Sequence, residues 1–89
     1  MNTLKVYVAK HCFGCDEATK LVGEIGRSLP GLQVIMIVID DVDEADLPDI
    51  PATPSYFLDG RLLFLGNPRL EELVTKIASF GQDKGGNHE

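Results

Sequence analysis

Apolar and polar positions in the first third of the chain predict a strand followed by a helix. Residues 3–9, TLKVYVA, alternate as a β-strand does. From Cys12 onward the apolar spacing becomes helical, and Pro30 ends the run. The apolar face of the strand would consist of Leu4, Val6 and Val8, and the helical stripe of Ala18, Leu21, Val22, Ile25 and Leu29.

The next segment, LQVIMIVID at residues 32–40, is almost continuously apolar and rich in β-branched side chains. This composition is typical of a central strand that is covered on both faces. A strand, a helix and a second strand in this order predict a parallel pair joined by a right-handed crossover.

The second half of the chain predicts a hairpin and a closing helix. Two apolar segments flank an Asp-Gly turn at residues 59–60, within IPATPSYFLDGRLLFLG at residues 50–66. Asn67 and Pro68 fit the N-cap and the first position of a helix. The stripe of that helix would be Leu70, Leu73, Val74, Ile77 and Phe80. We therefore expect an α/β domain over residues 1–80, ordered β-α-β-β-β-α, with a central mixed four-stranded sheet flanked by helices.

Two polar segments fall outside this scheme. Residues 81–89, GQDKGGNHE, are polar and rich in glycine, so we expect a flexible tail. Residues 40–49, DDVDEADLPD, are acidic and contain no basic residue. This run lacks the central glycine and the spaced glutamate of an EF-hand loop, and we interpret it as a solvated loop or a short capped helix.

Composition and charge narrow the classes of partner. The chain has 89 residues, enough for one small core, and a net charge of −6. Nucleic acids and anionic membranes favour basic surfaces, so neither is an expected partner. The longest apolar run, residues 34–39, is too short to span a bilayer, and the N-terminus shows no signal-peptide pattern. We expect a cytoplasmic monomer.

The chemistry of the chain concentrates in KHCFGC at residues 10–15, which holds its only two cysteines. A disulfide within this motif would contribute only roughly 2 kcal/mol, so a structural staple is a poor explanation. Tetrahedral zinc generally needs four ligands, and the chain has no second C-x-x-C. We therefore expect neither a metal nor an organic cofactor, although a metal ion or iron–sulfur cluster shared between two subunits remains an alternative.

A redox role fits the place of the pair at the start of a helix. Unpaired backbone N–H groups and the positive end of the helix dipole stabilise a thiolate there and lower its pKa. Cys12 is then the expected nucleophile, and Cys15 the resolving thiol that displaces a mixed disulfide. His11, when protonated, would favour the thiolate further, or is an exposed loop residue with little coupling. Phe13 is expected to contact the substrate.

These residues resemble the thioredoxin-like superfamily, and the size is similar to that of glutaredoxins and short thioredoxins. The resemblance rests on C-F-G-C after the first strand and on ATPSYFLDGRLLFLG, and it covers roughly residues 3–80. It implies a thioredoxin-like fold in which the Thr53–Pro54 peptide bond is cis and lies beside the cysteines. There the backbone of Thr53 would pair with an extended substrate segment. Pro51 is the competing candidate for the cis bond.

The chain also departs from the usual residues of this superfamily. Phe13-Gly14 stands where thioredoxins have Gly-Pro and common glutaredoxins have Pro-Tyr, and His11 stands where thioredoxins have Trp. Val6 takes the place of the buried carboxylate of thioredoxins. Water or another group must therefore deprotonate the Cys15 thiol.

The resulting hypothesis is a thiol–disulfide oxidoreductase of thioredoxin-like or glutaredoxin-like type. Its substrate would be a disulfide-bearing protein or small molecule, and its electron donor a dithiol or a flavin-dependent reductase. The catalytic residues would be Cys12 and Cys15, and the substrate-binding residues His11, Phe13, Thr53 and Pro54. The alternative from another class is a thioredoxin-like binding module without turnover.

Overall fold

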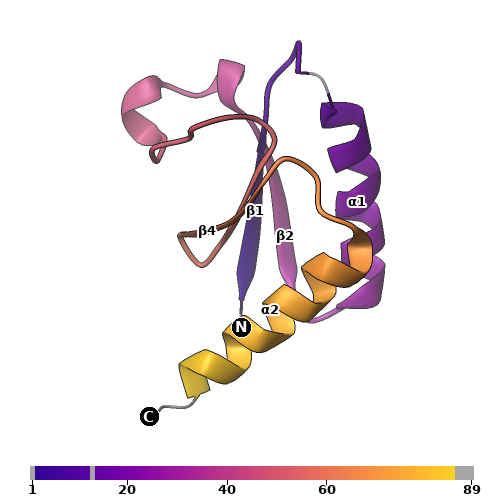
Figure 1. Ribbon diagram of the computed structural model, residues 1–89. Coiled ribbons are helices and arrows are strands. Elements are labelled where there is room, and N and C mark those ends of the chain that lie inside the picture. Colours follow the sequence, from indigo (N-terminus) through magenta and orange to yellow (C-terminus); the bar gives the residue numbers. More distant parts are fainter. Residues whose placement is uncertain (1, 13, 86–89) are drawn as a thin grey trace.

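The described residues form four strands, two α-helices and two short 3₁₀-helices (Figure 1). The computed structural model describes residues 2–12 and 14–85. In chain order the elements are β1 (Thr3–Val8), α1 (Cys15–Ser28), β2 (Gln33–Val38), η1 (Ile39–Asp41), η2 (Glu44–Asp46), β3 (Ser55–Leu58), β4 (Arg61–Leu65) and α2 (Leu70–Gly85). The predicted α/β order is therefore confirmed.

The four strands form one mixed sheet in the order β2-β1-β3-β4. β1 runs parallel to β2 and antiparallel to β3, and β3 pairs with β4 through the hairpin. The prediction that residues 32–40 form a central strand is wrong, because β2 lies at an edge of the sheet. With a neighbouring strand on one side only, the apolar side chains of β2 are half-buried rather than buried. The central strands are β1 and β3.

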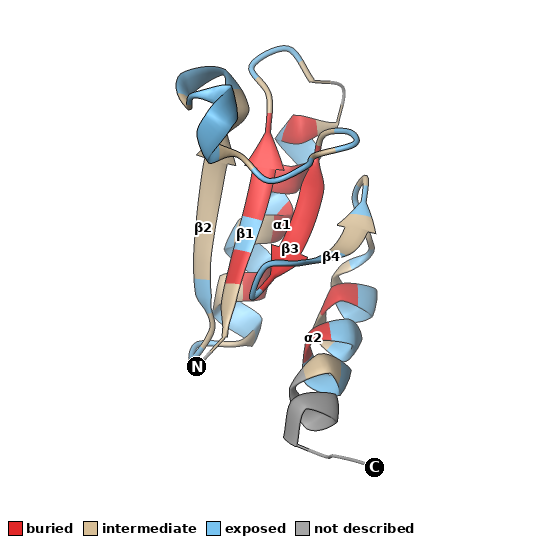
Figure 2. Ribbon diagram, turned by 90° about the vertical axis from the view of Figure 1, so that its left-hand side faces the viewer, coloured by how far each residue is buried: buried red, intermediate tan, exposed pale blue. Residues whose placement is uncertain are grey.

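The core lies between the sheet and the two helices, which cover the same face. Alternate residues of β1 point to this face, as predicted, and Figure 2 shows the buried positions concentrated on β1, β3 and the inner sides of the helices. The buried cluster consists of Leu4, Val6, Val8, Cys15, Ala18, Leu21, Ile25, Tyr56, Leu58, Leu73 and Ile77. Cys15 is therefore part of the core as well as of the C-x-x-C motif.

The hairpin turn matches its prediction. Asp59 and Gly60 both have positive φ, 50° and 86°, as a tight type I′ turn requires. The turn is also tied to the start of β1. The Asp59 N–H donates to the Thr3 carbonyl at 3.0 Å, and the Thr3 N–H donates to Asp59 Oδ1 at 2.9 Å.

The closing helix begins later than predicted. α2 starts at Leu70, so neither the N-cap assignment of Asn67 nor the helical assignment of Pro68 holds. Arg69 stands at the helix start instead. Its carbonyl accepts from the Leu73 N–H at 3.0 Å, and its own N–H donates to Glu72 Oε1 at 2.9 Å. This is the backbone half of a capping box, which satisfies an amide that the helix itself leaves unpaired.

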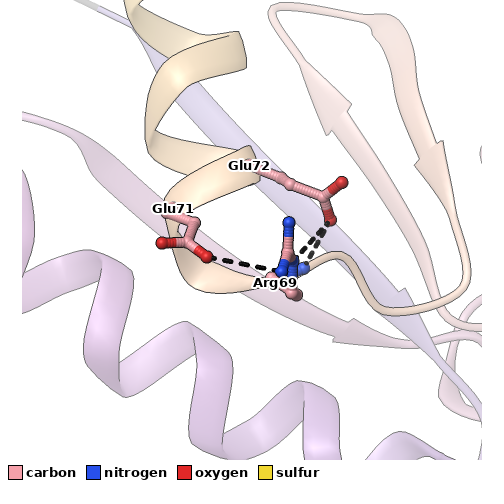
Figure 3. Close-up of polar contacts among 3 residues, drawn as sticks. All are labelled: Arg69, Glu71 and Glu72. Atoms are coloured by element: carbon pink, nitrogen blue, oxygen red, sulfur yellow. Dashed lines mark hydrogen bonds and ion pairs between the residues drawn. The ribbon is translucent and has the colours of Figure 1, made fainter.

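Exposed ion pairs accompany this start of α2 (Figure 3). The Arg69 side chain lies 3.6 Å from Glu71 and 3.9 Å from Glu72. At its other end the helix continues to Gly85, five residues past the predicted stripe. Residues 86–89 lie outside the described part of the chain, and the flexibility of the tail stays a prediction.

The acidic run forms the connection between β2 and β3. It contains the 3₁₀-helix η2 and most of η1, neither of which has a side-chain cap, and its acidic side chains are exposed, in agreement with a solvated loop. Within residues 2–12 and 14–85, no helix has the length and apolar character needed to cross a membrane.

Candidate functional site

Cys12 lies on the loop that joins β1 to α1, and Cys15 is the first residue of α1. They form a disulfide with sulfur atoms 1.94 Å apart and Cα atoms 5.4 Å apart. The prediction of a helix from Cys12 needs correction, because α1 begins only at Cys15. The pair therefore spans the helix boundary, with Cys12 in the preceding turn and Cys15 in the first helical position.

Gly14 sets this boundary. It is the N-cap of α1 and has a φ of 92°, in the left-handed region that side chains disfavour. The turn closes through a hydrogen bond from the Cys15 N–H to the Cys12 carbonyl at 3.2 Å. The Gly14 carbonyl then accepts the first bond of α1, from the Ala18 N–H at 3.1 Å. A left-handed residue before the helix thus lets the chain fold back and bring the two sulfur atoms together.

The two cysteines differ in accessibility. Cys15 is 9% exposed and belongs to the buried cluster, whereas Cys12 is half-buried at the edge of that cluster. An incoming disulfide therefore reaches Cys12 more easily than Cys15. This asymmetry agrees with the order of attack predicted from the sequence.

The Thr53–Pro54 peptide bond is cis, as predicted, and immediately precedes β3. Pro54 is buried and Thr53 half-buried. The Pro54 carbonyl accepts from the Gly66 N–H at 2.8 Å. Since the next residue, Asn67, bonds to Gly14, the segment 66–67 links the cis peptide to the cysteine loop.

Asn67 is the residue that sequence reasoning misassigned. Its Nδ2 donates to the Gly14 carbonyl at 2.8 Å, and its Oδ1 accepts from the Tyr56 hydroxyl at 2.8 Å. Its side chain thus forms a hydrogen bond with the cysteine loop instead of capping α2. The available signal was Tyr56 itself, because a tyrosine buried on a core strand needs a partner for its hydroxyl.

The side chain of Tyr56 is fully buried. Burial raises the pKa of Tyr56 well above its ordinary value, and the negative charge of Glu17 raises it further. The hydroxyl therefore stays protonated and acts as a hydrogen-bond donor.

The residues before Cys12 are more exposed. His11 is exposed, and Lys10 connects the loop to the acidic segment. The Lys10 N–H donates to Asp40 Oδ1 at 3.0 Å, and Lys10 Nζ lies 3.2 Å from Asp41. Figure 1 shows that this acidic segment and the cysteine loop occupy the same end of the sheet. Phe13, expected to contact the substrate, lies outside the described residues.

Within the part of the chain that the structure describes, no three His, Cys, Asp or Glu side chains are grouped so that they could hold a metal ion.

Comparisons with known proteins agree with this geometry. A family model described as "Thioredoxin domain" matches residues 2–78. Among solved structures, mitochondrial thioredoxin 3 from Saccharomyces cerevisiae in its oxidised form superposes with a TM-score of 0.72 at 19% identity, over 88% of this chain and 77% of the yeast chain. The germline-specific thioredoxin Deadhead from Drosophila melanogaster gives a TM-score of 0.63 at 17% identity, over 88% of this chain and 79% of the fly chain. No curated protein sequence matches this chain. At these identities the structural neighbours establish the fold.

Proposed function

Because the chain belongs to the thioredoxin-domain family, we propose that it is a thiol–disulfide oxidoreductase whose working group is the Cys12–Cys15 pair. The observation that carries this proposal is the disulfide between a half-buried Cys12 and a buried Cys15 at the start of α1. A bridge across so short a loop adds little stability, so its position is better explained by chemistry than by a structural role.

The reaction that follows from this geometry has two exchange steps. The Cys12 thiolate attacks one sulfur of a substrate disulfide, forms a mixed disulfide, and releases the other substrate sulfur as a thiolate that takes up a proton. Cys15 loses its proton and attacks the Cys12 sulfur, which releases the second substrate thiolate. The substrate gains two electrons, and the protein is left with the Cys12–Cys15 disulfide.

The start of α1 supplies the electrostatic support for the first step. Backbone N–H groups in the first helical turn and the helix dipole favour a thiolate on Cys12, which lies just before the helix. Asp16 and Glu17, both exposed in that turn, oppose this effect in part. Val6 offers no carboxylate to accept the Cys15 proton, so we assign that proton to water.

Substrate binding is proposed for the surface around Cys12. His11 and Phe13 flank the nucleophile in the sequence, and segment 66–67 links the Thr53–Pro54 peptide to its loop. An extended segment of a disulfide-bearing protein would pair with the backbone of Thr53, and a small-molecule disulfide would use the same site. We further propose a cytoplasmic monomer that a dithiol protein or a flavin-dependent reductase returns to the reduced form.

The two cysteines have separable roles, which can be tested by trapping. Cys15→Ser should accumulate a stable mixed disulfide with a model disulfide substrate, because the second step is blocked. Cys12→Ser should accumulate none, although its fold, measured by circular dichroism, should be unchanged. Mass spectrometry of the intact protein measures both. Equal trapping by the two variants would contradict the proposed roles, and binding of a partner without any mixed disulfide would favour a binding module.

A further inference from the structure

The side chain of Asn67 connects the hairpin to the peptide between the two cysteines. Its Oδ1 accepts from the Tyr56 hydroxyl and its Nδ2 donates to the Gly14 carbonyl, both at 2.8 Å. The same Gly14 carbonyl accepts from the Ala18 N–H. One carbonyl of the cysteine loop is thus held from within α1 and from the segment that follows β4.

The two partners of Asn67 fix the orientation of its amide group. The Gly14 carbonyl can only accept, so the amide nitrogen of Asn67 must face it. The amide oxygen is then turned toward Tyr56, whose hydroxyl donates to it. Because Tyr56 is fully buried on β3, it provides a fixed anchor for an Asn67 side chain that is itself exposed.

This connection gains importance when the disulfide is reduced. The turn then loses its covalent closure, and the Cys15 N–H bond to the Cys12 carbonyl, at 3.2 Å, is a long one. The bond from Asn67 is shorter and comes from outside the loop and the helix. It can therefore hold Gly14 in place while the sulfur atoms are separate.

We propose that Asn67, anchored by Tyr56, is a positioning residue that keeps the reduced cysteine loop in its closed conformation, so that Cys15 stays within reach of the Cys12 sulfur. The proposal rests on the proposed function, since it concerns the second exchange step. In that step the Cys15 thiolate attacks Cys12 Sγ, the Cys12–Cys15 bond forms, and the bond from Cys12 to the substrate sulfur breaks. The released thiolate takes a proton from water.

A positioning role predicts a selective effect. Ring closure depends on the distance between the two cysteines, whereas attack by Cys12 on a separate molecule does not. Loss of the Asn67 bond should therefore weaken closure and leave the first step nearly unchanged. A purely structural role would lower the melting temperature without this selectivity.

The test equilibrates the full chain with graded mixtures of reduced and oxidised glutathione, which gives the effective concentration of Cys15 toward Cys12. Asn67→Ala should reduce this concentration roughly three- to tenfold, the range that one net hydrogen bond supplies. Asn67→Asp should reduce it at least as much, because a carboxylate still accepts from Tyr56 but cannot donate to Gly14. Tyr56→Phe should have a smaller effect. Arg69→Ala is the matched control, because Arg69 follows Asn67 by two residues in the same connection between β4 and α2. This substitution should leave the effective concentration unchanged.

A second measurement isolates the first step. The rate at which Cys12 forms a mixed disulfide with oxidised glutathione should agree within about twofold between Cys15→Ser and Cys15→Ser/Asn67→Ala, because neither contains the resolving thiol. Unchanged ring closure in both Asn67 variants would overturn the proposal, as would an equal loss in Arg69→Ala or an equal loss in the first step. If the unmodified protein forms no internal disulfide in any glutathione mixture, the proposed function fails together with this inference.

Discussion

Val6 on β1 and Tyr56 on β3 are direct partners across the antiparallel pair, and both side chains are fully buried. The sequence resemblance places Val6 where thioredoxins carry a buried carboxylate. In this chain the polar atom at this pair of positions is the Tyr56 hydroxyl, which donates to Asn67. The core next to the cysteines thus contains a hydrogen-bond donor in place of a base. Through Asn67, this donor helps to hold the loop that carries Cys12 and Gly14.

Tyr56 should make the stability of the protein depend on pH in the alkaline range. Burial, followed by the charge of Glu17, raises its pKa in the folded state. Above the ordinary tyrosine pKa of about 10, the unfolded chain loses this proton while the folded chain retains it. The free energy of unfolding should therefore fall as the pH rises above about 10. Urea titrations of the protein and of Tyr56→Phe between neutral and alkaline pH measure this effect.

The Tyr56→Phe variant separates the contribution of Tyr56 to this pH dependence from that of other titrating groups. Burial also raises the pKa of Tyr7, so Tyr56→Phe should retain a shallower decline rather than none. An equally steep decline in the variant would contradict the assignment to Tyr56.

Gly14→Ala should destabilise the fold by about 1–2 kcal/mol, the cost of a left-handed conformation for a residue with a side chain. Gly14 has a φ of 92°, and an added Cβ would lie 3.3 Å from Asn67 Nδ2. Gly26→Ala is the matched control, because Gly26 lies within α1 and nothing is within 4 Å of the position of its Cβ. It should stabilise the helix by up to about 1 kcal/mol. Urea denaturation measures both, and equal effects of the two substitutions would contradict the account of Gly14.

The start of α2 gives a comparison of two neighbouring glutamates. Glu72 accepts from the Arg69 N–H at 2.9 Å, whereas Glu71 makes only an exposed ion pair at 3.6 Å (Figure 3). Glu72→Ala should lower the free energy of unfolding by about 0.5–1 kcal/mol, and Glu71→Ala by less than about 0.5 kcal/mol. Thermal denaturation at equal salt concentration compares them. A larger loss from Glu71→Ala would show that the ion pairs outweigh the cap.

Much of the fold could be predicted from local patterns. Alternation in residues 3–9 identified the buried face of β1, and the Asp59-Gly60 pair identified the hairpin turn. Such features depend on residues close together in the sequence. The cysteine pair and the cis Thr53–Pro54 bond could be predicted for a different reason, because a sequence motif and a family resemblance indicated them.

The errors concern features that depend on long-range neighbours. An apolar, β-branched strand at an edge resembles a central one, so the edge position of β2 could not be read from its composition. Asn67 before Pro68 has the sequence of a helix start, but hydrogen bonds to Tyr56 and Gly14 use its side chain elsewhere. The local preference of Asn67 for capping a helix is overridden by these tertiary contacts, which cannot be predicted from the adjacent residues.

The most direct test of the account is the redox equilibrium of the Cys12–Cys15 pair. The protein would be equilibrated in dithiol buffers of graded potential, and the free thiols trapped and counted by mass spectrometry. We expect a reversible two-electron transition near or below about −220 mV, as for cytosolic reductants. A transition near −120 mV would indicate an oxidant and contradict the proposed cytoplasmic role. If no Cys12–Cys15 disulfide forms at any potential, the protein is not a thiol–disulfide oxidoreductase.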